Sequence, residues 1–372
     1  MRKHNRIAAL ALAVILAVLP LTACGASGAP AVTFRDTVIT DHMYSFWLSS
    51  CKSDFLRAYG ASDSADFWSA ALDDGRTAQD LAQELLTARV QNYAAAAQLF
   101  REYKLKISEE TTEKIEADIA EKIDYYGGRD SLNEYLAKMD CNIDVLREVF
   151  VTEQKLLVLQ DYLYGTGGIY AVTESDVNLY YAAHYSRVHY ILFYTGTDYV
   201  RDDDGKPKTD ANGNFLTRTL TEEEKAQKQA RIAEAQAKLD AGETFEAVSE
   251  AYDEYPFDAS YYENGFHVSA NEVSTFGTAL VQAVSEMQTG EVRRVDDDLL
   301  TYIVRKEAPI TVSQMKACDT EQIPDLRADC VAQKFADLLS QYREEIKIDA
   351  EVVGKYAFDR AYPNSLIQFY DE

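Results

Sequence analysis

Residues Arg187–Phe193 (RVHYILF) and Leu300–Lys306 (LTYIVRK) decide the fold class of the central part of this chain. Both runs are short and rich in aromatic and β-branched side chains, which is typical of β-strands. Between them, Thr221–Glu224 (TEEE) matches a capping box that begins a long helix, and Gly242 ends that helix. The order of strand, hairpin-like insertion, helices and strand predicts an α+β unit over residues 187–309.

The remainder of the chain has the periodicity of helices. After a short strand or extended entry over 32–39, apolar side chains recur at helical spacing up to residue 185. The predicted elements are helices over 41–59, 77–105 and 142–164, shorter helices that begin after Ser108 and Thr173, and a last helix over 330–346. Amphipathic helices bury their apolar stripe against a partner. We therefore expect the C-terminal segment to pack on the N-terminal region.

The composition restricts the partners of the protein. The chain has 372 residues, of which 47% are hydrophobic, and a formal net charge of −25. Its length is sufficient for two or three domains with packed cores. A surface this acidic repels phosphate groups, which excludes nucleic acid as an expected partner.

The sequence predicts no metal and no cofactor. The patterns typical of metalloproteases, nucleotide-binding proteins and serine hydrolases are absent, and no cysteine and histidine group has metal-ligand spacing. The acidic stretch Asp202–Asn214 lacks the ligand spacing of a calcium loop. Its Asp-Gly and Asn-Gly pairs are turn formers, so we interpret it as a solvated hairpin insertion.

The N-terminus has the pattern of an export sequence. Arg2, Lys3 and Arg6 precede the apolar run Ile7–Leu19, which is shorter than the roughly 20 residues that span a bilayer. The run closes with Leu21–Cys24 (LTAC), which resembles the lipobox of bacterial lipoproteins. This resemblance implies that Cys24 is lipidated and anchors the protein to the extracytoplasmic face of the bacterial cell membrane.

Four further cysteines follow Cys24: Cys51, Cys141, Cys318 and Cys330. An extracytoplasmic location permits disulfides, and four cysteines allow three pairings. Buried free thiols fit the sequence equally well.

The central unit resembles the parvulin family of peptidyl-prolyl isomerases. The resemblance rests on the two strand phrases together with Leu239–Phe245 (LDAGETF) and Met287–Val292 (MQTGEV) between them. It implies rotation of the bond preceding proline, without a cofactor. Where the family places a histidine in each outer strand, this chain has Tyr190 and Tyr302.

The resemblance also implies the remaining site residues. The central acidic or thiol position of the family falls near Asp253 and Glu254, and the apolar substrate pocket falls near Phe266, Phe276 and Leu280. A register slip of one residue would exchange Tyr190 for His189, because neighbouring side chains of a strand face opposite sides. His189 is therefore a further candidate substrate contact.

The order of parts along the mature chain resembles the PrsA- and SurA-like extracytoplasmic foldases of bacteria. The implied parts are a lipoprotein signal peptide (1–23), a lipidated tether (24–31), a helical chaperone region like those of SurA and trigger factor (32–185), an inserted parvulin-like domain (186–309), and a C-terminal helix and tail that pack on the N-terminal region (310–372). The implied partners are unfolded or proline-containing secreted polypeptides.

Three functions remain open at this point. The central unit is either a working isomerase, with activity intact or weakened by the two tyrosines, or a holding chaperone without turnover. A scaffold lipoprotein for envelope assembly is the third. The chain contains 25 tyrosines, so Tyr190 and Tyr302 as ordinary packing residues are equally compatible with the sequence.

Overall fold

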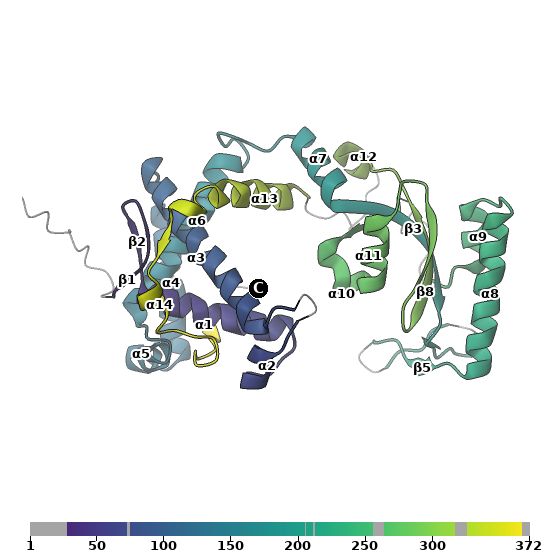
Figure 1. Ribbon diagram of the computed structural model, residues 1–372, viewed down its shortest axis with the longest axis horizontal. Helices are drawn as coiled ribbons and strands as arrows, with labels where there is room; N and C mark the ends of the chain where they lie inside the picture. Colours follow the sequence, from purple (N-terminus) through teal and green to yellow (C-terminus); the bar gives the residue numbers. More distant parts are fainter. Residues whose placement is uncertain are drawn as a thin grey trace, which may run out of the picture. The chain divides into compact units, whose positions relative to one another are not determined.

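The computed structural model describes residues 28–72, 75–204, 206–210, 213–255, 264–316 and 326–366, and it is α+β (Figure 1). The chain forms two units, the first from residues up to Leu163 together with those from Phe335 onward, the second from Tyr164–Lys334. The boundary at 163/164 lies earlier than the predicted 185/186. The predicted signal peptide and Cys24 lie outside the described residues. Within the described part of the chain, none of the helices has the length and apolarity to cross a membrane.

The first unit joins the two ends of the chain in one small sheet. Its strands are β1 (Pro30–Phe34), β2 (Thr37–Thr40) and β9 (Lys347–Ile348), in the order β2-β1-β9. The central strand β1 pairs antiparallel with both neighbours, with Val32 opposite Ile348. The C-terminal segment therefore belongs to the same unit as the N-terminal helices.

The helices of the first unit follow the predicted apolar stripes. They are α1 (Asp41–Ala58), α2 (Ala65–Ser69), α3 (Ala78–Glu102), α4 (Glu109–Tyr125), α5 (Arg129–Ala137), α6 (Ile143–Tyr164) and α14 (Ala350–Val353). The side chains of Thr77 and Ser108 accept hydrogen bonds from the first turns of α3 and α4, which sets where these helices begin. Trp47 and Leu48 of α1 are fully buried, as their spacing predicts.

A buried lysine ties the C-terminal segment to α1. The Lys52 side chain is wholly enclosed, and its Nζ donates to the carbonyl oxygens of Phe358 at 2.6 Å and Ala361 at 2.8 Å. The same atom lies 2.8 Å from a carboxylate oxygen of Asp63. A buried ammonium needs such acceptors, so the site holds the α1 helix, the loop before α2 and the C-terminal segment together.

The second unit is built on a four-stranded antiparallel sheet in the order β6-β3-β8-β7. Its strands are β3 (Tyr185–Tyr194), β6 (Phe266–Ser269), β7 (Val292–Asp296) and β8 (Leu300–Lys306). Strands β3 and β8 contain the two phrases on which the sequence prediction rests, and they are the central pair.

Helices cover both faces of this sheet (Figure 1). On one face, Ile191, Phe193 and Ile303 pack against α8 (Glu222–Asp240) and α9 (Phe245–Tyr252). The other face packs against α10 (Val273–Phe276) and α11 (Thr278–Glu286). A sheet covered on both faces explains why β3 and β8 are almost continuously apolar.

The remaining elements of the second unit are short. They are α7 (Glu174–His184), the hairpin β4 (Thr197–Tyr199) and β5 (Thr217–Thr219), α12 (Val312–Lys316) and α13 (Leu326–Ser340), which runs on into the first unit. In the hairpin, Asp202 accepts from the backbone of Asp204 and Lys206, so this carboxylate closes a turn. The predicted last helix, 330–346, begins and ends earlier than expected.

Candidate functional site: an aromatic face of the second unit

Tyr190 and Tyr302 lie on the two central strands and share one face of the sheet. In the register of β3 and β8, Tyr190 is opposite Val304 and Leu192 is opposite Tyr302. An offset of two residues places the two tyrosines diagonally across the strands on the same side. Their rings meet edge to face, with centroids 5.3 Å apart and an angle of 80° between the planes. The two positions aligned with the histidines of the parvulin family are therefore in contact.

Three further rings complete an aromatic cluster, which we define as Tyr190, Tyr255, Phe266, Phe276 and Tyr302. Phe266 of β6 stacks on Tyr190, with centroids 4.5 Å apart and planes within 12°. Tyr255, just after α9, stands nearly perpendicular to both of these rings. Phe276 at the end of α10 meets Phe266 edge to face at 6.0 Å. Such offset and perpendicular contacts contribute about 0.5–1.5 kcal/mol per ring pair beyond the burial of apolar area.

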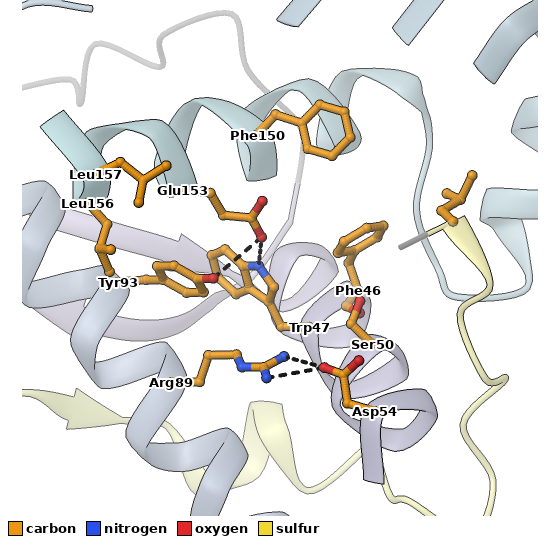
Figure 2. Close-up of a pocket in the computed structure, with 11 residues that line it drawn as sticks. Phe46, Trp47, Ser50, Asp54, Arg89, Tyr93, Phe150, Glu153, Leu156 and Leu157 are labelled. Atoms are coloured by element: carbon orange, nitrogen blue, oxygen red, sulfur yellow. Dashed lines mark hydrogen bonds and ion pairs between the residues drawn. The ribbon is translucent and has the colours of Figure 1, made fainter. Parts of the chain in front are cut away.

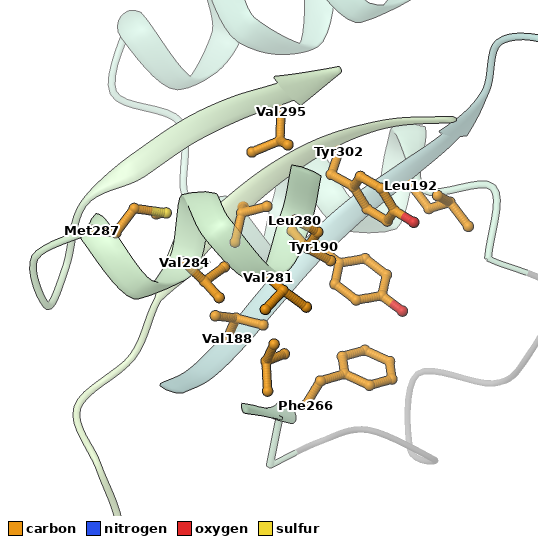
Figure 3. Packing of buried hydrophobic residues seen from close by; sticks show 12 residues of the cluster. Val188, Tyr190, Leu192, Phe266, Leu280, Val281, Val284, Met287, Val295 and Tyr302 are labelled. Atoms are coloured by element: carbon orange, nitrogen blue, oxygen red, sulfur yellow. The ribbon is translucent and has the colours of Figure 1, made fainter. Parts of the chain in front are cut away.

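Aliphatic side chains support the cluster from the side of α11. Leu280 of α11 is fully buried against the same face of the sheet, next to Val281 and Val284. Figure 3 shows the hydroxyl groups of Tyr190 and Tyr302 pointing to the same side, at the opposite end of the packed layer from Met287. The cluster thus brings an apolar wall and two phenol groups together in one buried layer.

The chemistry of this face is that of neutral hydrogen-bonding groups. Burial raises the pKa of Tyr302 to about 12, and the nearby carboxylate of Asp297 acts in the same direction. The phenol is therefore uncharged at pH 7, when it both donates and accepts hydrogen bonds. Such a group offers hydrogen bonds without introducing a charge into an apolar layer.

Asp253 and Glu254 lie beside the C-terminal half of β3, past the residues that pair with β6. Asp253 Oδ1 accepts hydrogen bonds from the backbone N–H of Leu192 at 2.9 Å and of Tyr255 at 3.0 Å. Glu254 Oε2 accepts from the backbone N–H of Tyr194 at 3.0 Å and from Lys228 Nζ at 2.6 Å. The two carboxylates occupy backbone donors of β3 beyond its pairing with β6, and they position Tyr255 against Tyr190.

His189 lies on the opposite face from Tyr190, as the alternation of a strand requires. Its Nδ1 is 3.0 Å from a carboxylate oxygen of Glu307, which also accepts from Arg305. Arg305 in turn reaches Glu246 of α9. The structure therefore does not bring His189 to the aromatic cluster, although it brings together Tyr190, Tyr302 and the predicted pocket residues.

Tyr255 is the member of the cluster that the sequence analysis missed. It follows directly after Asp253 and Glu254, in a loop whose register against the strands could not be read from periodicity. The signal for its position is the pair of carboxylates themselves, because each accepts a hydrogen bond from β3 and so fixes the loop beside that strand.

No family model matches the chain, and no curated protein matches it. The solved structures that the chain resembles include PrsA foldases. PrsA from Bacillus subtilis is 19% identical over 78% of this chain and 93% of its own, with a TM-score of 0.23. Peptidylprolyl isomerase PrsA from Bacillus cereus is 17% identical over 77% and 90%, with a TM-score of 0.27.

Foldase protein PrsA from Streptococcus pneumoniae is 12% identical over 77% of this chain and 97% of its own, with a TM-score of 0.22. Because identities and TM-scores are this low, these superpositions establish no shared site.

Proposed function

We propose that this protein is a lipid-anchored extracytoplasmic foldase whose second unit is a parvulin-like peptidyl-prolyl isomerase domain inserted into a helical chaperone region. The observation that carries the proposal is the contact between Tyr190 and Tyr302 on one face of the central strands, with Phe266 stacked on Tyr190. This contact supports a shared role for the two hydroxyl groups.

The cluster contains the groups that prolyl isomerisation needs. The barrier of about 18–20 kcal/mol arises from the double-bond character of the planar amide. An apolar wall disfavours the charge-separated planar form, and an O–H donor stabilises the nitrogen lone pair that appears when the bond twists. In this proposal Phe266 and Phe276 hold the proline ring, and the hydroxyls of Tyr190 and Tyr302 donate to the twisted peptide.

A protease-coupled assay on short Xaa-Pro peptides tests the isomerase. We expect rates above buffer for the wild-type protein, and losses of about 5–10-fold in Tyr190→Phe and Tyr302→Phe, the equivalent of one hydrogen bond. Tyr180→Phe is the matched control, because Tyr180 of α7 packs against His184 and Tyr185, away from the cluster. Wild-type rates equal to buffer would reject catalysis.

A holding chaperone is the second candidate function, favoured by the first unit. Its helices α1, α3 and α6 line an open groove with aromatic walls, and Leu85 and Leu157 beside it are about half exposed. Exposed apolar surface of this kind binds unfolded segments. Suppression of client aggregation by a protein without isomerase activity would support this function, and failure of both assays would reject the foldase.

The proposed anchor has a separate test. Cys24 is the residue that would be lipidated, and the substitution Cys24→Ser removes the thiol. We expect the wild-type protein to partition into detergent with bacterial membranes and the variant to remain in the aqueous phase. Equal partitioning of both proteins would reject lipid anchoring at Cys24.

A further inference from the structure

The first unit contains a groove that the isomerase proposal does not use. It consists of two adjoining cavities of about 340 Å³ and 530 Å³, both lined by Asp54, Arg89, Tyr93 and Leu156. Helices α1, α3 and α6 form its walls (Figure 2). Because the two cavities share these residues, we treat them as one continuous groove.

The smaller cavity has aromatic walls. Phe46 and Trp47 of α1, Tyr93 of α3 and Phe150 of α6 line it. Trp47 and Tyr93 are stacked with their centroids 4.5 Å apart. Ring faces carry partial negative charge and attract cations, most strongly when water is excluded.

The carboxyl group of Glu153 lies between these rings. Glu153 Oε1 accepts from Trp47 Nε1 at 3.0 Å and from the Tyr93 hydroxyl at 3.5 Å, and both donors are neutral. Within the described part of the chain, no ion pair involves Glu153, because the nearby Arg89 pairs with Asp54 at 3.2 Å. Figure 2 shows the second oxygen of Glu153 pointing away from Trp47 and Tyr93. Burial raises the pKa of this carboxyl group, while the hydrogen bonds from Trp47 and Tyr93 and the charge of Arg89 act against that shift. A cation that enters the cavity would stabilise the charged form of Glu153 further.

The larger cavity suits the neighbouring part of a polypeptide. Its lining includes the apolar side chains of Tyr59, Leu81 and Leu85. Asn92 also lines it, and its Oδ1 is buried without a hydrogen-bond partner in the structure. A buried acceptor of this kind costs free energy until a donor reaches it, and a peptide N–H is such a donor.

We propose that this groove binds an extended polypeptide segment by one lysine or arginine side chain, whose cation enters the aromatic cavity and pairs with Glu153, while neighbouring apolar side chains fill the larger cavity. The aromatic walls accept the alkyl stem, and the carboxylate neutralises the charge. The proposal deepens the holding function proposed above and rests on it. It adds that bound segments are chosen for a basic residue beside apolar ones.

Peptide binding tests the preference directly. Two blocked, labelled octapeptides are compared by fluorescence anisotropy, one with a lysine flanked by leucines and one with acetyl-lysine in its place. We expect the lysine peptide to bind the full-length protein about 10-fold more tightly, in line with a charge-assisted hydrogen bond. Equal affinities for the two peptides would overturn the proposal without any variant being made.

Glu153→Gln identifies the residue responsible. The glutamine amide keeps an oxygen that accepts from Trp47, so we expect the variant to fold. We expect the difference in affinity between the lysine and acetyl-lysine peptides to disappear. Asp161→Asn is the matched control on the exposed side of α6, where the preference should persist. A preference that survives Glu153→Gln would overturn the assignment, as would binding of n-butylammonium without binding of either peptide.

The same preparations separate this inference from the holding function. Suppression of client aggregation by a protein that binds both peptides equally would overturn the lysine preference and leave the holding function intact. A lysine preference in a protein that does not suppress aggregation would support the groove as a peptide site and reject the holding function.

Discussion

Replacing Lys52 by methionine should destabilise the first unit substantially. Lys52 is fully buried, and its ammonium makes three contacts of 2.6–2.8 Å to Phe358, Ala361 and Asp63. Methionine retains the packing volume beside Trp68 but leaves the two carbonyl oxygens without this donor. Removing one partner of a buried charged group costs about 3–5 kcal/mol. Asp63 is partly exposed and can be hydrated again, so we expect about 3 kcal/mol.

The location of the two tryptophans makes this effect measurable. The chain has two tryptophans, Trp47 and Trp68, and both belong to the first unit. Urea unfolding followed by tryptophan fluorescence therefore reports on that unit alone. With a slope of about 2 kcal/mol per molar urea, a loss of 3 kcal/mol lowers the midpoint by about 1.5 M. Cleavage of the C-terminal segment by trypsin at Lys355 and Arg360 should accelerate in parallel.

Lys114→Met is the matched control. Lys114 is exposed on α4, so the same substitution there should change stability by less than about 0.5 kcal/mol. If Lys52→Met unfolds at the midpoint of the control, the buried ammonium does not hold the C-terminal segment in place, and the reasoning fails.

Three further predictions concern the second unit. Because the pKa of Tyr302 is raised to about 12, isomerase rates should stay level between pH 6 and pH 9, and a step near pH 6.5 would show that a histidine acts in its place. His267, whose Nδ1 is 2.8 Å from the Tyr181 hydroxyl, has a pKa lowered by burial to about 4. Below about pH 6.5 the unfolded chain binds a proton at His267 that the folded chain does not bind. The free energy of unfolding should therefore decrease by about 2 kcal/mol between pH 7 and pH 5. Urea unfolding followed by circular dichroism should show that His267→Gln removes this part of the pH dependence, and an unchanged dependence contradicts the assignment. Gly265 has φ of +77°, and an added Cβ would lie 2.6 Å from the Val188 carbonyl oxygen. Gly265→Ala should therefore cost about 2 kcal/mol in the same assay and lower isomerase rates, whereas wild-type behaviour would show that the backbone there adapts freely.

Local signals in the sequence predict much of the second unit. The capping boxes at Thr173 and Thr221 are both formed, and each begins its helix at the predicted residue. The alternation of side chains in β3 separates Tyr190 from His189 because the two faces of the sheet meet different helices. These features depend on residues that are close in the sequence. They can therefore be predicted from a single sequence.

Features that depend on partners far away in the sequence were not predicted. Strand β9 has two residues, too few for a recognisable pattern, and pairs with β1 at the other end of the chain. Lys52 lies in a helix whose pattern predicts an exposed lysine, and acceptors more than 300 positions away allow it to be buried. Tyr255 reaches the aromatic cluster through carboxylate contacts to a strand that precedes it by some 60 residues.

The pairing of β1 with β9 sets the order in which the units can form during synthesis. The second unit is contiguous in sequence, so all of its residues have been made before residue 348 exists. Until then β1 lacks a partner on one edge, and Lys52 lacks the carbonyls of Phe358 and Ala361. Unpaired strand edges are sites of association with other chains. If translation stops before the last 30 residues are made, the released chain contains all residues of the second unit. Its first unit lacks β9 and exposes the free edge of β1 to association with other chains.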